Sequence, residues 1–174
     1  EFRRVLFRSA RGEGGYIGIK INSLTDKVLI NKLIEASQAG VHIDMVVRGI
    51  CCLRAGVPDE TDNIHIISIV GRYLEHSRIY IFGRGERARY YIGSADWMTR
   101  STLRRVEIAA PVTAPTLKAR LQHIFNTMLA DNSNARVQQP DGNYVRRMPG
   151  ADAVDCQAQF YEEAYQANVH SDLK

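Results

Sequence analysis

The chain has 174 residues, of which 45% are hydrophobic, and its 23 lysines and arginines outnumber its 19 aspartates and glutamates. That length and composition fit one soluble globular domain with a substantial core. No stretch approaches the roughly 18 to 20 uncharged apolar residues of a membrane-spanning helix, and no leader with a cleavage site opens the chain, so we expect a cytoplasmic protein without a transmembrane segment.

The first nine residues read differently from the rest of the chain. Residues 1–9 contain three arginines and one glutamate, and they match the translation of one strand of a common sequencing adapter. We therefore expect an assembly artefact that makes few packed contacts and lies outside the core. The domain itself is then expected over residues 10–150, followed at residues 151–174 by an acidic tail that could form a helix.

The pattern that follows predicts a strand, a helix and a second strand. Tyr16–Ile21 places isoleucine at every second position, which indicates a strand. Asp26 is one of several capping candidates for a helix that ends at Gly40. His42–Val47 is a short strand rich in apolar residues, and two strands joined by one helix usually lie parallel with a right-handed crossover.

The centre of the chain is expected to form a sheet. Residues 51–63 read as a loop, and a helix is expected from Pro115 to about Asp131. Further strands or extended segments are expected at residues 64–70, 77–82, 90–93, 106–110, 135–139 and 143–146. The predicted fold class is therefore α/β, with a mixed β-sheet flanked by α-helices.

The three cysteines are Cys51, Cys52 and Cys156. Their spacing fits neither a disulfide framework nor a cysteine-rich metal site, so we expect all three to be reduced. Because free cysteine behaves as a small apolar side chain, Cys51 and Cys52 are expected to be buried structural groups.

Arginine is concentrated in one part of the chain. Between Gly71 and Arg105 all eight basic residues are arginines, against three acidic residues. The planar guanidinium group suits bidentate binding of phosphate, so one interpretation is a phosphate-rich ligand. The other interpretation is a solvated charged face on an ordinary domain.

A candidate chemical motif lies within this stretch. His-Ser-Arg at 76–78 and Gly-Ser-Ala-Asp at 93–96 resemble the His-x-Lys and Gly-Ser-x-Asn signature of phospholipase-D-type enzymes, with Arg78 in place of lysine, Asp96 in place of asparagine and a single copy of the motif. Along a strand, His76 and Arg78 share one face, where an imidazole could handle a proton or a phosphoryl group beside a permanent cation. On this motif alone, a structural histidine is the alternative.

A longer resemblance covers residues 17–147. Its blocks are KINSL at 20–24, EASQAGV at 35–41, VRGICCLR at 47–54, SIVGR at 68–72, HSR at 76–78, SADWM at 94–98 and RRVE at 104–107. Over these blocks the chain resembles the C-terminal catalytic domain of bacterial polyphosphate kinase, a phospholipase-D-like enzyme that reversibly extends inorganic polyphosphate from ATP. Ala55 and Ser101 depart from the family pattern, and we expect these two differences to affect the conformation of the loops and not the activity.

The resemblance implies roles for two residues. Arg48 and His76 correspond to the family's arginine and histidine that contact the nucleotide phosphates. We ourselves infer that Arg78 is a supporting cation, and we expect His76 and Arg78 to be the catalytic residues. Our own inference adds phosphate-binding candidates from residue type and position: Ser94, Asp96, Arg104 and Arg105. Glu107 either orients His76 or pairs with Arg104 and Arg105 as a structural salt bridge, and both alternatives stay open.

The family mechanism implies a phosphohistidine intermediate on a histidine of an upstream domain, so His76 is expected to be its partner and not the nucleophile. Magnesium is implied together with ATP, although no ligands for it can be named in this sequence. The expected partners are ATP or ADP and inorganic polyphosphate, not nucleic acid, and the full-length enzyme is expected to be a homo-oligomer.

Two other functions remain open on the residues alone. A phospholipase-D-like phosphodiesterase or nuclease should carry lysine at position 78 and a second complete motif, whereas an inert anion-binding module should have no role for His76. On the kinase interpretation, Arg48 and His76 should converge on one cleft at an edge of the sheet, with Ser94 or Asp96 near the same space.

Overall fold

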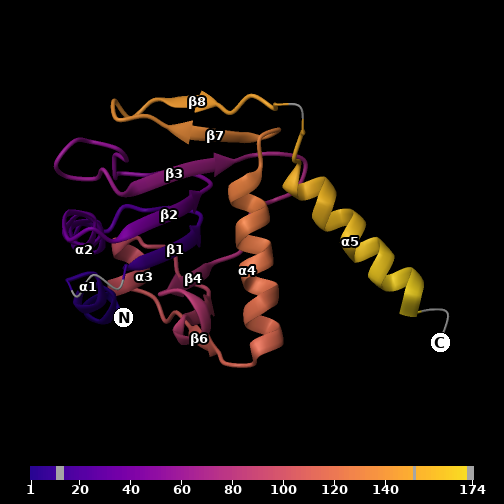
Figure 1. Ribbon diagram of the computed structural model, residues 1–174, viewed down its shortest axis with the longest axis horizontal. Helices are drawn as coiled ribbons and strands as arrows, with labels where there is room; N and C mark the ends of the chain where they lie inside the picture. Colours follow the sequence, from indigo (N-terminus) through magenta and orange to yellow (C-terminus); the bar gives the residue numbers. More distant parts are fainter. Residues whose placement is uncertain (11–13, 151, 172–174) are drawn as a thin grey trace.

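The centre of the molecule is one mixed sheet (Figure 1). The computed structural model describes residues 1–10, 14–150 and 152–171. The strands are β1 (Tyr16–Ile21), β2 (His42–Val47), β3 (Ile64–Ile69), β4 (Ile79–Phe82), β5 (Arg89–Gly93), β6 (Ala109–Val112), β7 (Ala135–Gln138) and β8 (Tyr144–Arg146). Their order is β6-β5-β4-β1-β2-β3-β7-β8, with β1, β2 and β3 parallel and the other neighbours antiparallel.

The predicted βαβ unit forms the middle of this sheet. Helix α2 (Lys27–Gln38) joins β1 to β2, and the carboxylate of Asp26 caps it by accepting hydrogen bonds from the backbone N–H groups of Val28 (3.0 Å) and Leu29 (3.1 Å). The chain leaves the helix through Gly40, whose φ of 79° favours glycine. The expected parallel pairing of the first two strands is confirmed.

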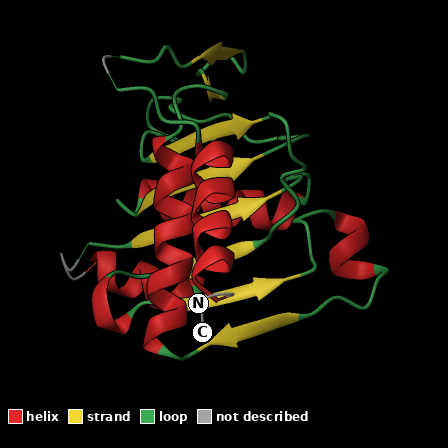
Figure 2. Cartoon of the chain, turned by 90° about the vertical axis from the view of Figure 1, so that its right-hand side faces the viewer, coloured by secondary structure: helices red, strands yellow, loops and turns green. Residues whose placement is uncertain are grey.

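Helices cover both faces of the sheet. They are α1 (Phe2–Ala10), α2, the short α3 (Thr99–Leu103), α4 (Pro115–Ala130) and α5 (Cys156–Ser171), with a single 3-10 turn, η1 (Gly85–Arg87), between β4 and β5. One apolar cluster packs α1 and α2 against the sheet, and a second packs α4 and the first turn of α5 against the opposite face. Figure 2 shows helices lying across the stacked strands, and the predicted α/β class is confirmed.

The N-terminal segment packs more closely than we expected. Val5 is only 2% exposed and belongs to the core cluster, and the ring of Phe2 lies 5.9 Å from the rings of both Phe82 and Trp97. The expectation of few packed contacts outside the core is therefore wrong. Its physical reason is that the apolar residues of this segment recur at helical spacing, so α1 can cover apolar side chains of the sheet. The adapter origin of residues 1–9 stays a prediction.

Two strands begin later than the sequence indicates. β4 begins at Ile79 instead of residue 77, and β6 begins at Ala109 instead of residue 106. Val106 is 99% exposed and follows α3, which the alternation of residues did not predict. Residues 77–78 and 106–108 therefore lie outside the regular strands, although the N–H groups of Gly93 and Ser94 still donate to the carbonyl oxygens of Arg78 (3.3 Å) and Ile108 (3.0 Å).

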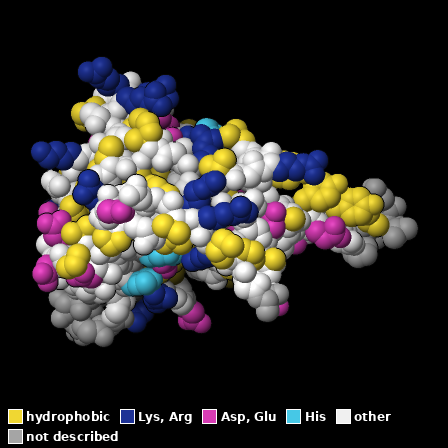
Figure 3. Space-filling model, turned by 90° about the horizontal axis from the view of Figure 1, so that it is seen from above, with side chains coloured by type: hydrophobic (Ala, Val, Ile, Leu, Met, Phe, Trp, Pro, Cys, Tyr) yellow, Lys and Arg dark blue, Asp and Glu magenta, His cyan; other side chains and the backbone are white. Residues whose placement is uncertain are grey.

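The C-terminal segment is a helix, one of the two possibilities considered. Its first residue, Cys156, is fully buried, but further along α5 leaves the sheet (Figure 1) and exposes Tyr161, Tyr165 and Val169. Figure 3 shows apolar side chains along this projecting part. Among the described residues, no helix is long and apolar enough to cross a membrane.

Candidate functional site

The register of the sheet brings the candidate residues to one edge. Lys20 pairs with Ile79, and Ile79 pairs with Ile92 in the next strand. The end of β1, the start of β4 and the end of β5 therefore lie together, and the parallel strand β2 ends at the same edge. The segments at this edge include Arg48 after β2, residues 76–78 before β4 and residues 94–96 after β5.

Arg78 and Asp96 form the firmest contact at this edge. An Nη of Arg78 lies 3.1 Å from Oδ2 of Asp96, and the other Nη donates to the carbonyl oxygen of His76 at 2.9 Å. Oδ1 of Asp96 accepts hydrogen bonds from the backbone N–H groups of Asn22 (2.8 Å) and Ser23 (3.3 Å). Asp96 therefore braces Arg78 against the end of β1 instead of standing free to meet a ligand.

The same contacts explain the acidity of Asp96. Burial alone would raise its pKa, but the hydrogen bond and charge of Arg78 and the donating backbone groups of Asn22 and Ser23 outweigh it and hold the pKa below its ordinary value. The carboxylate is therefore ionised at neutral pH, as its pairing with Arg78 requires.

Lys20 is a buried cation that sequence reasoning did not single out. Its side chain is fully buried, and Nζ donates to the carbonyl oxygens of Glu75 and Ser77, each at 3.3 Å. Burial lowers the pKa of Lys20 to about 8, with Glu75 opposing this shift and Arg48 and Arg78 adding to it. The sequence signal for Lys20 was a lysine among the alternating isoleucines of β1. The structure adds that its ammonium group lies next to the segment that carries His76.

Ser94 is also engaged with its own chain. Its hydroxyl donates a short hydrogen bond to Glu107 and accepts one from the backbone N–H of Ile108 at 3.0 Å. Glu107 thus bonds to Ser94, and its two alternative roles, orienting His76 or pairing with Arg104 and Arg105, stay predictions. A Cβ on Gly93 would lie 2.8 Å from the carbonyl oxygen of Ile108, so close strand packing already requires this glycine.

The remaining candidates have side chains that are at least partly accessible. His76, Arg104 and Arg105 are exposed, and Arg48 is half-buried, with its carbonyl oxygen accepting a hydrogen bond from Ser68 at 3.0 Å. Arg104 and Arg105 follow α3 in the connection to β6. That the side chains of Arg48 and His76 face one cleft stays a prediction, but His76 is not sealed in the apolar core.

Other features of the molecule offer less chemistry. No group of three or more potential metal ligands occurs among the residues that the structure describes. All three cysteines are free, as expected, but Cys52 is exposed and the prediction that it is buried is wrong. It sits in the loop after β2 and not in either apolar cluster.

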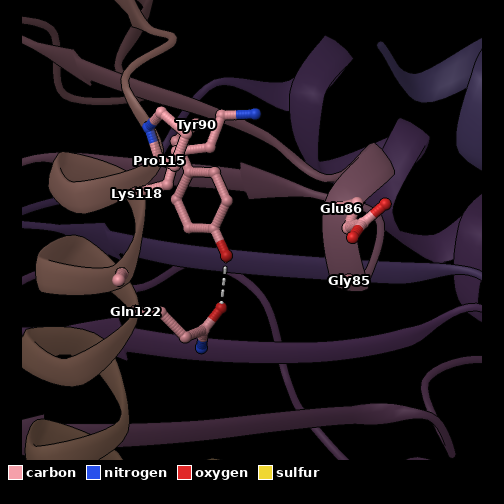
Figure 4. A pocket seen from close by; sticks show the side chains of 7 residues that line it. Gly85, Glu86, Tyr90, Pro115, Lys118 and Gln122 are labelled. Carbon is pink, nitrogen blue, oxygen red and sulfur yellow. Dashed lines mark hydrogen bonds between the residues drawn. The ribbon is translucent and has the colours of Figure 1, made fainter.

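The largest of the described cavities, about 490 Å³, lies away from this edge (Figure 4). It is bordered by Gly85, beyond the far end of β4, and by α4, and the hydroxyl of Tyr90 donates to Gln122 across it at 2.7 Å. None of the candidate site residues lines it.

The sequence of the chain is similar to the sequences of known proteins. The family model described as polyphosphate kinase C-terminal domain 2 matches residues 2–159. The polyphosphate kinases of Bacillus anthracis and Pseudomonas aeruginosa are each 50% identical to the chain, over 153 and 142 residues, which are 87% and 82% of this chain and 22% and 21% of those proteins. The chain thus spans about a fifth of the length of these relatives.

Solved structures give the same result. The crystal structure of polyphosphate kinase from Porphyromonas gingivalis matches 95% of this chain and 26% of its own, with a TM-score of 0.90 and 38% identity. NucT from Helicobacter pylori, at 13% identity and a TM-score of 0.50 over 74% of this chain and 89% of its own, shares the fold alone. Both structures agree with the predicted fold class, a mixed β-sheet flanked by α-helices. A family match across residues 2–159 shows that the chain belongs to the polyphosphate kinase family and carries its C-terminal domain 2.

Proposed function

We propose that this domain supplies one half of the active site of an ATP:polyphosphate phosphotransferase, which moves the γ-phosphoryl group of ATP reversibly to inorganic polyphosphate. Family membership supports the reaction. The observation that carries the proposal for this domain is that the segments bearing Arg48, His76 and Arg78 lie at one sheet edge, where Arg78 donates a hydrogen bond to the carbonyl oxygen of His76. The ligands proposed are ATP or ADP and polyphosphate.

Arg48 and His76 are the proposed phosphate-contacting residues. Arg48 follows the end of a buried parallel strand, where open α/β sheets commonly bind ligands, and its guanidinium can hold two phosphate oxygens at once. His76 is exposed at the same sheet edge, on a segment held by Arg78. As a cation or a hydrogen-bond donor, it would stabilise the charge that builds on the phosphate oxygens during transfer. Arg104 and Arg105 would bind the outer part of the polyphosphate.

The covalent step is proposed for a histidine outside this chain. One imidazole nitrogen of that histidine forms a bond to the γ-phosphorus while the bond to the bridging oxygen breaks and ADP leaves with the electron pair. A terminal oxygen of polyphosphate then attacks the same phosphorus and releases the histidine. His76 assists by donating a hydrogen bond to the leaving oxygen, and it forms no bond to phosphorus.

Magnesium normally accompanies phosphates in transfer reactions. The carboxylates at this edge do not fit such an ion, because Asp96 is bound to Arg78 and backbone N–H groups and Glu107 to Ser94. We therefore assign no step of this domain to the metal.

The test uses the full-length enzyme with His76→Ala and Arg48→Ala, and Arg146→Ala as an exposed control. We expect polyphosphate synthesis to fall at least 100-fold in the first two variants and to stay within about twofold in the control. Synthesis at the wild-type rate with His76→Ala would leave the domain as an anion-binding module. Hydrolysis of a phosphodiester by the wild type, abolished by His76→Ala, would favour the phosphodiesterase alternative.

A further inference from the structure

The segment between β3 and β4 carries His76 and forms neither helix nor strand over residues 70–78, although the backbone N–H of Gly93 donates to the carbonyl oxygen of Arg78 at 3.3 Å. An exposed side chain on such a segment is mobile unless the backbone on each side is fixed. Besides the hydrogen bond from Arg78 to the carbonyl oxygen of His76, the structure fixes it from two elements that are distant in sequence, β1 and α5.

The contact from β1 is made by Lys20. Its ammonium group donates to the carbonyl oxygens of Glu75 and Ser77, the residues directly before and after His76. These bonds join positions 55 and 57 residues apart. Through these two hydrogen bonds, the buried Lys20 holds residues 75–77 against β1, a central strand of the sheet.

The contact from α5 is made by Gln157. Its side-chain oxygen accepts a hydrogen bond from the backbone N–H of Tyr73 (2.8 Å), and its amide nitrogen donates to the carbonyl oxygen of Tyr73 (2.9 Å) and to the carboxylate of Glu75 (2.7 Å). Gln157 is 5% exposed and Glu75 is 7% exposed. Both the oxygen and the nitrogen of the Gln157 side-chain amide are therefore hydrogen-bonded to this segment.

We propose that Lys20, Glu75 and Gln157 form a buried polar clamp that positions His76, which makes the first turn of α5 a working part of the site. The proposal rests on the proposed function in taking His76 as the phosphate-contacting group. Lys20, Glu75 and Gln157 are positioning residues, because they act on the backbone around His76 and not on the substrate.

Charge and packing both support the clamp. The buried ammonium group of Lys20 and the buried carboxylate of Glu75 compensate each other, so neither charge is left alone in the interior. The Gln157 amide can approach only because residue 71 is glycine, since a Cβ there would lie 2.6 Å from its side-chain oxygen. The start of α5 is anchored in turn, because the backbone N–H of Cys156 donates to the buried Asp131 at 2.9 Å.

The experiment compares Gln157→Leu and Lys20→Met with matched controls in the full-length enzyme. The controls are Gln159→Leu and Lys32→Met, which remove side chains that are bonded only at the surface. We expect kcat to fall 10- to 100-fold in the clamp variants with the KM for ATP within about threefold, and no change in the controls. Backbone amides at residues 73–77 should exchange with solvent at least tenfold faster in the clamp variants.

A double-mutant cycle separates positioning from general stability. If Gln157 acts through His76, Gln157→Leu should change activity by less than twofold in a His76→Ala background. An equal loss in both backgrounds would overturn the clamp, as would unchanged exchange at residues 73–77. Should Gln157→Leu fail to fold, Gln157→Glu keeps the oxygen that accepts from Tyr73 and removes the nitrogen that donates to the carbonyl oxygen of Tyr73 and to Glu75, and the same two readouts apply.

The two proposals fail differently. Wild-type activity with His76→Ala would refute the proposed function, and amide exchange would then still decide whether the clamp holds the segment. Loss of activity with His76→Ala alone, with no effect of the clamp variants, would refute the clamp and leave the proposed function intact.

Discussion

Replacing Asp96 with alanine should destabilise the domain strongly, although the residue lies at the edge of the sheet. The substitution removes the acceptor of two backbone N–H groups, those of Asn22 and Ser23, and the partner of Arg78. The side chains of Arg78 and Asp96 are 13% and 12% exposed, so water compensates only in part. Hydrogen bonds to a charged group contribute about 1.5 to 3 kcal/mol each, and the longer one contributes least, so we expect a loss of about 3 kcal/mol.

The pH dependence of this loss follows from the pKa of Asp96. Because the folded-state pKa is below the unfolded value, the carboxylate stabilises the fold above about pH 4, and this contribution disappears as the pH falls through the folded-state pKa. Urea unfolding should therefore give the full difference between wild type and Asp96→Ala at pH 7 and a smaller one at pH 3. For a chain of this length, 3 kcal/mol corresponds to a lower Tm by about 6 to 12 °C.

Two further variants control the measurement. Asp152→Ala, at an exposed aspartate, should change the free energy of unfolding by less than about 0.5 kcal/mol. Asp96→Asn keeps an oxygen for the N–H groups of Asn22 and Ser23 but not the charge, so its loss should be intermediate. A loss below 1 kcal/mol for Asp96→Ala at pH 7, or one that grows at pH 3, would refute the assignment of Asp96 as a brace.

Three more outcomes are expected from particular contacts. Burial lowers the folded-state pKa of Lys20 to about 8, so at alkaline pH the folded protein binds fewer protons than the unfolded chain. Between pH 7 and 10 the unfolding free energy of the wild type should therefore rise by about 2 kcal/mol relative to that of Lys20→Met. No rise would contradict the buried amine. Gly93→Ala should lower the free energy of unfolding in urea by about 1 to 3 kcal/mol, because the new Cβ would meet the carbonyl oxygen of Ile108. Gly150→Ala, where there is open space around the Cβ, should leave that free energy unchanged. Val5→Ala should cost about 2 kcal/mol in thermal unfolding, and an unchanged Tm would mean that α1 does not pack as described.

The centre of the fold could be predicted because its signals are local. The alternating isoleucines of β1, the cap at Asp26 and the glycine at position 40 lie within a few residues of the elements they define. The parallel pairing of β1 and β2 then puts the ends of both strands at one edge, which is why Arg48 could be assigned to that edge from sequence. The short α3 and the late start of β6 have no comparable periodic signal.

The internal contacts of the site could not be predicted in the same way. The bonds of Gln157 to Tyr73 and Glu75 join residues 82 to 84 positions apart, and nothing in either segment indicates the other. Asp96 and Ser94 were predicted as phosphate-binding residues from their types, but the structure engages both with the chain itself. Residue type gives the chemistry that a side chain can perform, whereas packing decides whether its hydrogen-bonding groups are free.

The two departures from the phospholipase-D-type signature compensate each other. A lysine at position 78 would be a point charge, whereas the planar fork of Arg78 reaches the carbonyl oxygen of His76 at 2.9 Å with one nitrogen and Asp96 at 3.1 Å with the other. An asparagine at position 96 could accept from the same backbone N–H groups but would leave that arginine unpaired. Arginine and aspartate together keep the oxygen acceptor, add an ion pair and fix the backbone of His76. Because Asp96 offsets the charge of Arg78, the contacts of this arginine favour a role in positioning the backbone of His76 over direct binding of a ligand.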